Sequence, residues 1–220
     1  MDGGSETIIE RNLIHNADIG IEMASEHQGH ATSFVTARNN LVYWANSAGI
    51  SIGGYASNVG GTDHCTIVNN TLFQNDMKNT ASGEFQIQYY ATNNVFKNNV
   101  VYATSQGLFI NDYTNSEPDP AGMDYNLYYS SLSSSAADFL WNGTNLTGFS
   151  TYQSATGKDS HSQSLDPQFL SLTTPDLHVQ STSPAVNAGI NLGPGVVGTL
   201  DFAGNLRVQG TNIDIGAYEQ

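Results

Sequence analysis

Apolar and polar residues alternate over short windows of this chain, and the windows recur at a nearly constant interval. The fullest window runs from Val35 to Tyr55. A two-residue period predicts β-strands, because successive side chains of a strand point to opposite faces, whereas a helix repeats every 3.6 residues. Each copy of the window is therefore predicted to contain a strand, an asparagine turn, a second strand and a loop.

The copies align on an asparagine that returns every 27 to 30 residues, at Asn12, Asn40, Asn70, Asn99 and Asn126. Three positions earlier every copy is apolar, with Ile9, Ala37, Ile67, Phe96 and Met123. Two positions later come Ile14, Val42, Leu72, Val101 and Tyr128. Three positions later comes an aromatic column of His15, Tyr43, Phe73, Tyr102 and Tyr129. A period of this length indicates a solenoid, in which each strand pairs with its equivalent one coil away.

Asparagine suits a corner between strands, because it tolerates left-handed backbone geometry and bonds to nearby backbone groups. Stacked on successive coils, asparagine amides can also bond one another as a ladder. Over roughly residues 7 to 130 the pattern resembles the right-handed parallel β-helix family, the pectate-lyase-like solenoids. The resulting prediction is an all-β, right-handed parallel β-helix of about five to six rungs with an irregular C-terminal cap.

We expect one domain over residues 1–220, with regular rungs in 7–130, an irregular excursion in 131–165 and a last rung plus cap in 166–220. The motifs of the final segment resemble the tail of secreted or surface-attached bacterial β-helix proteins, some described as carrying a "choice-of-anchor" segment. This resemblance implies a secreted or cell-surface location in a bacterium. The chain enters almost directly on a repeat and shows no leader, so we expect upstream rungs or a leader to be missing from it.

Charge narrows the range of partners. The chain carries 6 Lys and Arg against 20 Asp and Glu, for a formal net charge of −14. Nucleic acid is excluded as a partner, because phosphate binding needs Lys and Arg. No apolar run of about eighteen residues is present to span a membrane. Polysaccharide or oligosaccharide remains as the expected partner, with no required cofactor.

The second strands are predicted to form an outward wall that binds saccharide. Glu22, Ser51, Gln86 and Phe109 are expected to stack in one row along this wall. Amide groups and aromatic rings along a groove suit the hydroxyls and apolar faces of sugar rings. The residues expected to contact sugar are Tyr55, Gln86, Gln88, Asn111, Asp112 and Tyr113.

Cleavage of the saccharide is the second part of the hypothesis. Hydrolysis needs two carboxylates about 5–5.5 Å apart for retention or about 6.5–9.5 Å for inversion. Lyase chemistry needs a base that removes the proton α to a uronate, and a group that neutralises the uronate carboxylate. The wall offers a histidine–tyrosine pair as the base but no well-placed Lys or Arg. The candidate catalytic residues are Glu22, Glu26, His27 and Glu84. The alternative is a non-catalytic saccharide-binding or adhesive surface solenoid.

A metal site is the remaining candidate. His30, Asp63 and His64 fall in loops of neighbouring coils. Imidazole with carboxylate suits zinc or copper, whereas carboxylates alone suit Ca²⁺. Hydrogen bonds that order the loops are the competing interpretation of these residues.

Overall fold

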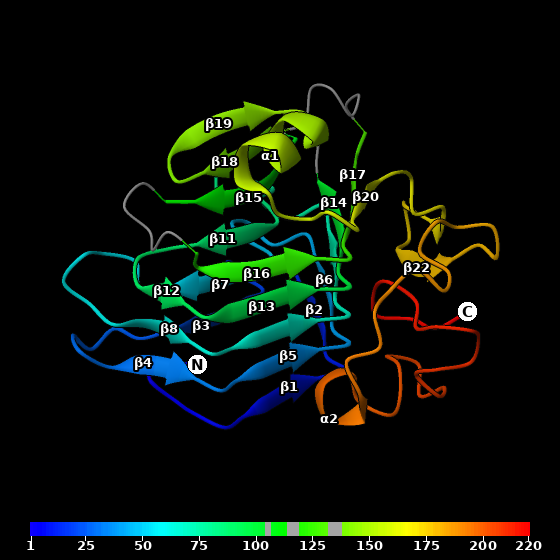
Figure 1. Cartoon of the computed structure of the whole chain (residues 1–220), viewed down its shortest axis with the longest axis horizontal. Helices are drawn as coiled ribbons and strands as arrows, with labels where there is room; N and C mark the ends of the chain where they lie inside the picture. Colours follow the sequence, from blue (N-terminus) through cyan, green and yellow to red (C-terminus); the bar gives the residue numbers. More distant parts are fainter. Residues whose placement is uncertain (104–106, 114–118, 132–137) are drawn as a thin grey trace.

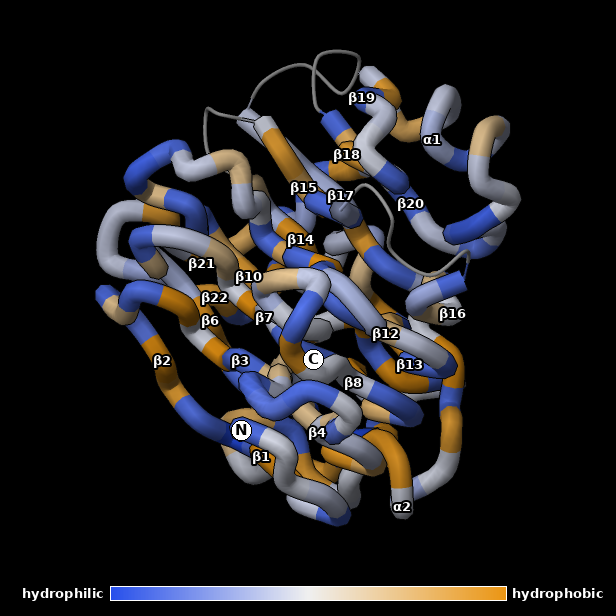
Figure 2. Tube along the Cα trace, turned by 90° about the vertical axis from the view of Figure 1, so that its left-hand side faces the viewer, coloured by the Kyte–Doolittle hydropathy of each residue, from blue (hydrophilic) through white to orange (hydrophobic). Residues whose placement is uncertain are grey.

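The computed structural model describes residues 1–103, 107–113, 119–131 and 138–220. They form an all-β parallel solenoid of about four turns with few helices, and Figure 1 shows the coils stacked one upon another. The predicted fold class is confirmed. Hydrophobic and hydrophilic stretches alternate along the coiled trace, as Figure 2 shows.

Four stacks of strands build the walls of the solenoid, all parallel except for the terminal pair of sheet 3. We number them in the order in which the chain enters them. Sheet 1 holds β1 (Ile8–Glu10), β5 (Thr36–Arg38), β9 (Thr66–Val68), β13 (Asn94–Lys97) and β16 (Ala121–Asp124). Sheet 2 holds β2 (Leu13–His15), β6 (Leu41–Tyr43), β10 (Thr71–Phe73), β14 (Val100–Ala103), β17 (Leu127–Ser130) and β20 (Gln163–Ser164).

The other two walls complete each coil. Sheet 3 holds β3 (Ile21–Ala24), β7 (Ile50–Gly53), β11 (Phe85–Ile87), β15 (Leu108–Asp112), β18 (Asp138–Trp141) and β19 (Thr144–Thr147). Sheet 4 holds β4 (Ala31–Ser33), β8 (Gly61–Asp63) and β12 (Ala91–Thr92). The strands of sheet 4 occupy stretches that were expected to be loop, because they are short and lack a long apolar alternation.

The anchoring asparagines form the predicted ladder at the corner between sheets 1 and 2. Asn40 donates its side-chain amide to Oδ1 of Asn70 at 2.9 Å, and Asn70 donates to Oδ1 of Asn99 at 3.1 Å. The left-handed backbone of the corner belongs to the preceding residue, as at Asn39 and Asn69, both with φ of 55°. The sequence pattern predicts this geometry at the ladder asparagine itself, one residue too late.

The two apolar columns that flank the ladder point into the solenoid. Ala37, Val42, Ile67 and Leu72 are fully buried there. Phe96 stacks face to face on Phe85 of the opposite wall, with ring centroids 4.1 Å apart. One continuous core therefore runs through the coils, as the column pattern predicts.

The aromatic column lies on the outer face of sheet 2 rather than in this core. Tyr43, Phe73 and Tyr102 stand in register on adjacent strands. A second apolar cluster covers them, contributed by the tail with Phe169, Leu177, Val179, Ala185, Ile215 and Ala217. The sequence predicts that the tail adds a last rung and caps the core, whereas in the structure it lies along the flank of sheet 2, on the right in Figure 1.

The last coil is closed by residues that precede the tail. The hairpin of β18 and β19 and the helix α1 (Phe149–Thr156) lie over the end of the coils in Figure 1. Phe139 and Tyr152 are buried in the main core and stack at a centroid distance of 4.1 Å. Of the excursion expected over 131–165, residues 132–137 lie outside the described part of the chain.

The tail itself contains little regular structure. It pairs β21 (Phe169–Ser171) with β22 (Asp176–Val179) in antiparallel fashion, and it carries the single-turn helix α2 (Pro194–Val197). No helix within the described ranges is long and apolar enough to cross a membrane.

Candidate functional site

The outward row of sheet 3 stacks largely as predicted. Glu22 pairs in register with Ser51, Ser51 with Gln86, and Gln86 with Asn111. Asn111 takes the place expected for Phe109, which is instead 2% exposed and packs in the core. The fourth strand is thus shifted by two residues from the predicted alignment.

Three predicted sugar contacts hydrogen-bond to one another instead of presenting free polar groups. Gln86 Oε1 accepts bonds from Ser51 Oγ at 3.1 Å and from Gln88 Nε2 at 3.0 Å. Both glutamine Nε2 atoms also reach Tyr113 Oη, at 3.4 and 3.5 Å. Both glutamines and Ser51 are buried, so this network supports the wall and does not form an open groove.

Asn111 and Asp112 are buried as well and tie sheet 3 to neighbouring segments. Asn111 Nδ2 donates to the carbonyl of Ala81 at 2.7 Å. Asp112 Oδ2 accepts the backbone N–H of Asn142 at 2.9 Å. Among the predicted contacts, Tyr55 remains well exposed on the surface.

Glu84 is separated from the other predicted catalytic residues. It is fully buried, and its two carboxyl oxygens accept the backbone N–H of Asn75 at 2.8 Å and the side-chain amide of Asn75 at 2.7 Å. Burial raises the pKa of Glu84 to about 8 despite these hydrogen bonds. The carboxyl group is therefore protonated near neutral pH and holds the loop of Asn75, away from solvent.

The other three predicted catalytic residues lie together on the first coil. Glu22, Glu26 and His27 are all exposed. The N-terminal ammonium of Met1 donates to the carbonyl of Glu22 at 2.7 Å, and Asp2 Oδ1 accepts the N–H of Glu26 at 2.9 Å. The side chains thus lie at the edge of the first coil, whereas the fourth candidate, Glu84, is buried on Asn75.

The predicted metal ligands are not gathered around one point. Within the described ranges, no group of three or more His, Cys, Asp or Glu side chains is placed to hold a metal ion. Asp63 accepts hydrogen bonds from His64 at 2.8 Å, Thr92 at 2.8 Å and Asn93 at 2.9 Å. Partial burial opposes these bonds, but together they outweigh it and lower the pKa of Asp63. The loop-ordering interpretation fits Asp63 and His64.

A cleft of about 310 Å³ opens beside sheet 4 and is lined by two of the three predicted metal ligands, His30 and Asp63. Residues 28–31, Ser57 and residues 59–61 line it on one side, and Tyr90 and Thr92 line it from the next coil. The cleft exists because two glycine-containing loops approach each other closely. A Cβ added at Gly60 would lie 2.0 Å from the carbonyl oxygen of His30.

Tyr90 is the main apolar surface at this cleft, and it was not among the predicted site residues. Its side chain is 43% exposed, while its hydroxyl donates to the carbonyl of Ser57 at 2.7 Å. This bond fixes the orientation of the ring across the cleft. The sequence signal was the pair Tyr89-Tyr90 directly after the polar strand end of Gln88.

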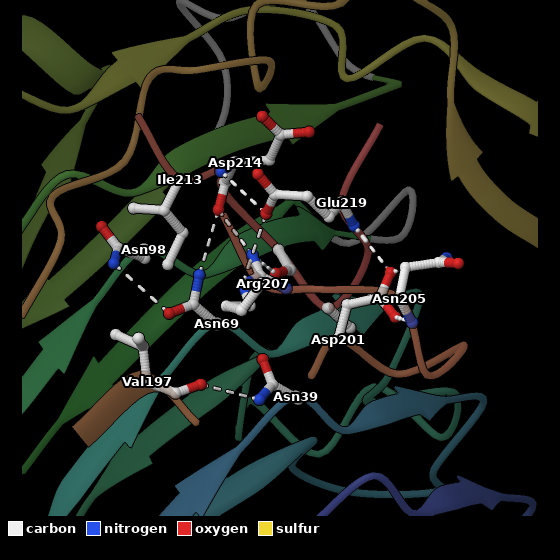
Figure 3. Close-up of polar contacts among 12 residues, drawn as sticks. Asn39, Asn69, Asn98, Val197, Asp201, Asn205, Arg207, Ile213, Asp214 and Glu219 are labelled. Carbon is white, nitrogen blue, oxygen red and sulfur yellow. Dashed lines mark hydrogen bonds and ion pairs between the residues drawn. The ribbon is translucent and has the colours of Figure 1, made fainter. Parts of the chain in front are cut away.

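A separate buried polar cluster holds the tail on the solenoid (Figure 3). Arg207, 1% exposed, donates Nη2 to the carbonyls of Asp214 and Gly216 at 2.7 and 2.8 Å. Its Nε lies 3.5 Å from Oε2 of Glu219. Burial lowers the pKa of Arg207 and raises that of Glu219 to about 7.

The residues that precede the ladder asparagines receive this tail. Asn39 donates to the carbonyl of Val197 at 2.9 Å, Asn69 to that of Asp214 at 3.0 Å and Asn98 to that of Ile190 at 2.9 Å. Two of these contacts are drawn in Figure 3. The repeated Asn-Asn pair in the sequence is the signal that could have located this surface.

Comparison with known proteins gives one informative match. The chain is 34% identical over 186 residues to a protein of Bacillus subtilis (strain 168) named "Uncharacterized protein YwoF". The match covers 84% of this chain and 39% of that protein, so the chain spans well under half the length of this relative. No family model matches the chain. No solved structure matches it either.

Proposed function

We propose that this chain binds a saccharide in the cleft between Tyr90 and Asp63. A tyrosine face offers an apolar platform for a sugar ring, and an adjacent carboxylate accepts hydrogen bonds from its hydroxyls. The observation that carries the proposal is the 43% exposed ring of Tyr90, held in place by its bond to Ser57. A ring fixed in this way loses little conformational freedom when a ligand stacks on it.

The carboxylate of Asp63 can accept a further hydrogen bond from a ligand. A carboxylate has about four lone-pair sites, and Asp63 uses two on Oδ1 and one on Oδ2. Its lowered pKa keeps it ionised at neutral pH. Thr92 and His30 add further polar groups to the same lining.

Charge favours a neutral or amino sugar over a polyuronate. The chain has a formal net charge of −14, and like charges raise the cost of bringing a polyanion close. An ionised Asp63 inside the cleft adds to this repulsion. We also propose that the protein acts outside a bacterial cell, because the tail motifs resemble those of secreted and surface-attached proteins.

Binding without cleavage is the better-supported form of the proposal. Glu84, one of the candidate carboxylates, is buried and hydrogen-bonded to Asn75, and Glu22 and Glu26 do not line the cleft. Cleavage stays a hypothesis to be tested alongside binding, by assaying the same saccharides for new reducing ends and unsaturated uronates.

The test is isothermal titration calorimetry with a panel of neutral, amino and acidic oligosaccharides. Tyr90→Ala is expected to weaken the best ligand by up to about tenfold, because stacking on an aromatic ring contributes about 0.5–1.5 kcal/mol and about 1.4 kcal/mol corresponds to a tenfold change in affinity. Asp63→Asn tests the carboxylate separately. Leu206→Ala, which removes an exposed apolar side chain of the tail, is the control and should bind as the unmodified chain does. Unchanged affinity in Tyr90→Ala would refute the proposed site.

A further inference from the structure

The corner between sheets 4 and 1 has the same left-handed backbone on successive coils. Its φ angles lie between 53° and 56°, at Glu6, Phe34, His64 and Asn93. Asparagine is one of the few residues that visit this region readily, so Asn93 suits the corner. A bulky residue such as Phe34 is an outlier there. The corner geometry therefore belongs to the solenoid, and the chain adopts it even where the side chain is unfavourable.

Neither burial nor backbone preference accounts for Phe34. It is 57% exposed, although its side chain is large and apolar. Trp44 and Tyr125 also have a left-handed backbone, but both are half-buried. Tyr90, the ring of the proposed saccharide cleft, resembles Phe34 in both respects, with a φ of 59° and an exposed side chain. Backbone strain of this kind is concentrated at ligand-binding sites.

The ring of Phe34 forms a platform with His64, which we call the Phe34–His64 platform. The two ring centroids lie 5.3 Å apart, and the ring planes differ by 23°. Asp63 Oδ2 lies 2.8 Å from Nδ1 of His64 and so fixes the imidazole. The carboxylate that lines the cleft therefore also orients the platform.

The platform continues the cleft on the side of Asp63 that faces away from Tyr90. Asp63 pairs with Ser33 on one neighbouring strand and with Thr92 on the other, and all three side chains are half-buried. By strand register, Phe34 lies two strands and three residues from Tyr90. At about 4.8 Å per strand and about 3.3 Å per residue, their backbones are about 14 Å apart.

From this arrangement we infer that the ligand is a linear oligosaccharide, with one sugar ring on Tyr90 and another on the Phe34–His64 platform. This assignment rests on the saccharide function proposed above and extends it from a single cleft to a chain of sugars. One sugar ring cannot reach both aromatic side chains, so the ligand must contain several units. The hydroxyls of the intervening units would meet the polar row of Ser33, Asp63 and Thr92.

The test is calorimetry with oligomers of one to six units, using β-1,4-linked glucose as the neutral series and β-1,4-linked glucosamine as the amino series. Phe34→Asn is expected to weaken the longest oligomer about two- to tenfold and to leave the affinity for the single sugar unchanged. Tyr90→Ala should weaken both. Affinity for the unmodified chain should rise with length until both platforms are covered.

Two controls separate binding from folding. Phe34→Asn should keep the Tm of the unmodified chain or exceed it, because asparagine fits this corner, as it does at Asn93. Phe34→Tyr retains the ring and should retain the affinity. Met77→Asn removes an apolar side chain of similar exposure, 54%, from the loop between β10 and β11, and it should bind as the unmodified chain does.

The outcomes distinguish the two proposals. If Tyr90→Ala weakens binding but Phe34→Asn does not, or if Phe34→Asn weakens the single sugar as much as the longest oligomer, the extended ligand is wrong and the cleft stands. If neither variant changes the affinity, or if neither series binds, both the cleft and the extended ligand are wrong.

Discussion

Oδ1 of Asn70 accepts two hydrogen bonds from Asn40, one from the backbone N–H at 3.1 Å and one from the side-chain amide at 2.9 Å. Both residues are fully buried. This step of the ladder therefore satisfies two buried donors. The ladder joins coils 30 residues apart in sequence at one corner of the solenoid.

Replacing Asn70 by Ala should destabilise the fold strongly. It would leave the two buried donors of Asn40 without an acceptor, and each unsatisfied buried group costs about 1–3 kcal/mol. We expect a loss of about 3 kcal/mol in the free energy of unfolding, measured in urea. Asn12→Ala, at the exposed end of the ladder, is the control and should cost less than about 1 kcal/mol. Similar losses in both variants would contradict a ladder role.

Arg207 is expected to hold the tail against sheet 2. Arg207→Ala removes the donor of two buried carbonyls and leaves Glu219 without its cation. Breaking a buried pair by removing one partner costs about 3–5 kcal/mol, so we expect early cleavage of the tail in limited proteolysis. Lys78→Ala, at an exposed lysine, should leave the digestion pattern unchanged. A tail that still resists proteolysis in Arg207→Ala would show that the apolar contacts alone hold it on sheet 2.

Glu84 should make the protein less stable as pH rises. Its pKa is about 8 in the folded chain against an ordinary value of 4.5. Below pH 4.5 both states hold the proton, whereas between about 4.5 and 8 only the folded state keeps it, so the free energy of unfolding falls across this window. Glu84→Gln should flatten that slope by up to about 1.4 kcal/mol per pH unit. Glu26→Gln, at an exposed site, should retain it, and equal slopes in both variants would argue against a protonated Glu84.

Cys65 should be inert to thiol reagents in the folded protein. It is the single cysteine of the chain and is fully buried, and burial raises the pKa of its thiol. Because the thiolate is the reactive form, reaction with Ellman's reagent should proceed only as the chain unfolds. A fast reaction under native conditions would mean that the third coil opens readily.

The stacked architecture could be predicted because equivalent positions of successive coils carry the same type of residue at a nearly constant spacing in the sequence. A ladder needs asparagine at one position in every coil, and Asn40, Asn70 and Asn99 occupy it at a spacing that only stacking explains. The flanking inward columns follow from the two-residue period of strands. In the same way, the sequence pattern correctly predicts the register of Glu22, Ser51 and Gln86.

The site was harder to predict, because burial depends on what covers a residue rather than on its own strand. Gln86 and Gln88 do point outward from sheet 3, yet they lie in a buried network with Tyr113. Glu84 has the sequence context of an exposed strand end and is instead enclosed by the loop of Asn75. The path of the tail could not be predicted either, since its apolar residues could cover the end of the solenoid or the outer face of one of its sheets.

A crystal structure of the chain soaked with the saccharide that binds best in calorimetry is the most direct test of the proposed function. We predict density for a sugar ring stacked on Tyr90, with a hydroxyl within hydrogen-bond distance of Asp63. Density for the sugar beside Glu22 and Glu26 with an empty cleft would contradict the proposal and would show that the binding site lies on the wall of sheet 3.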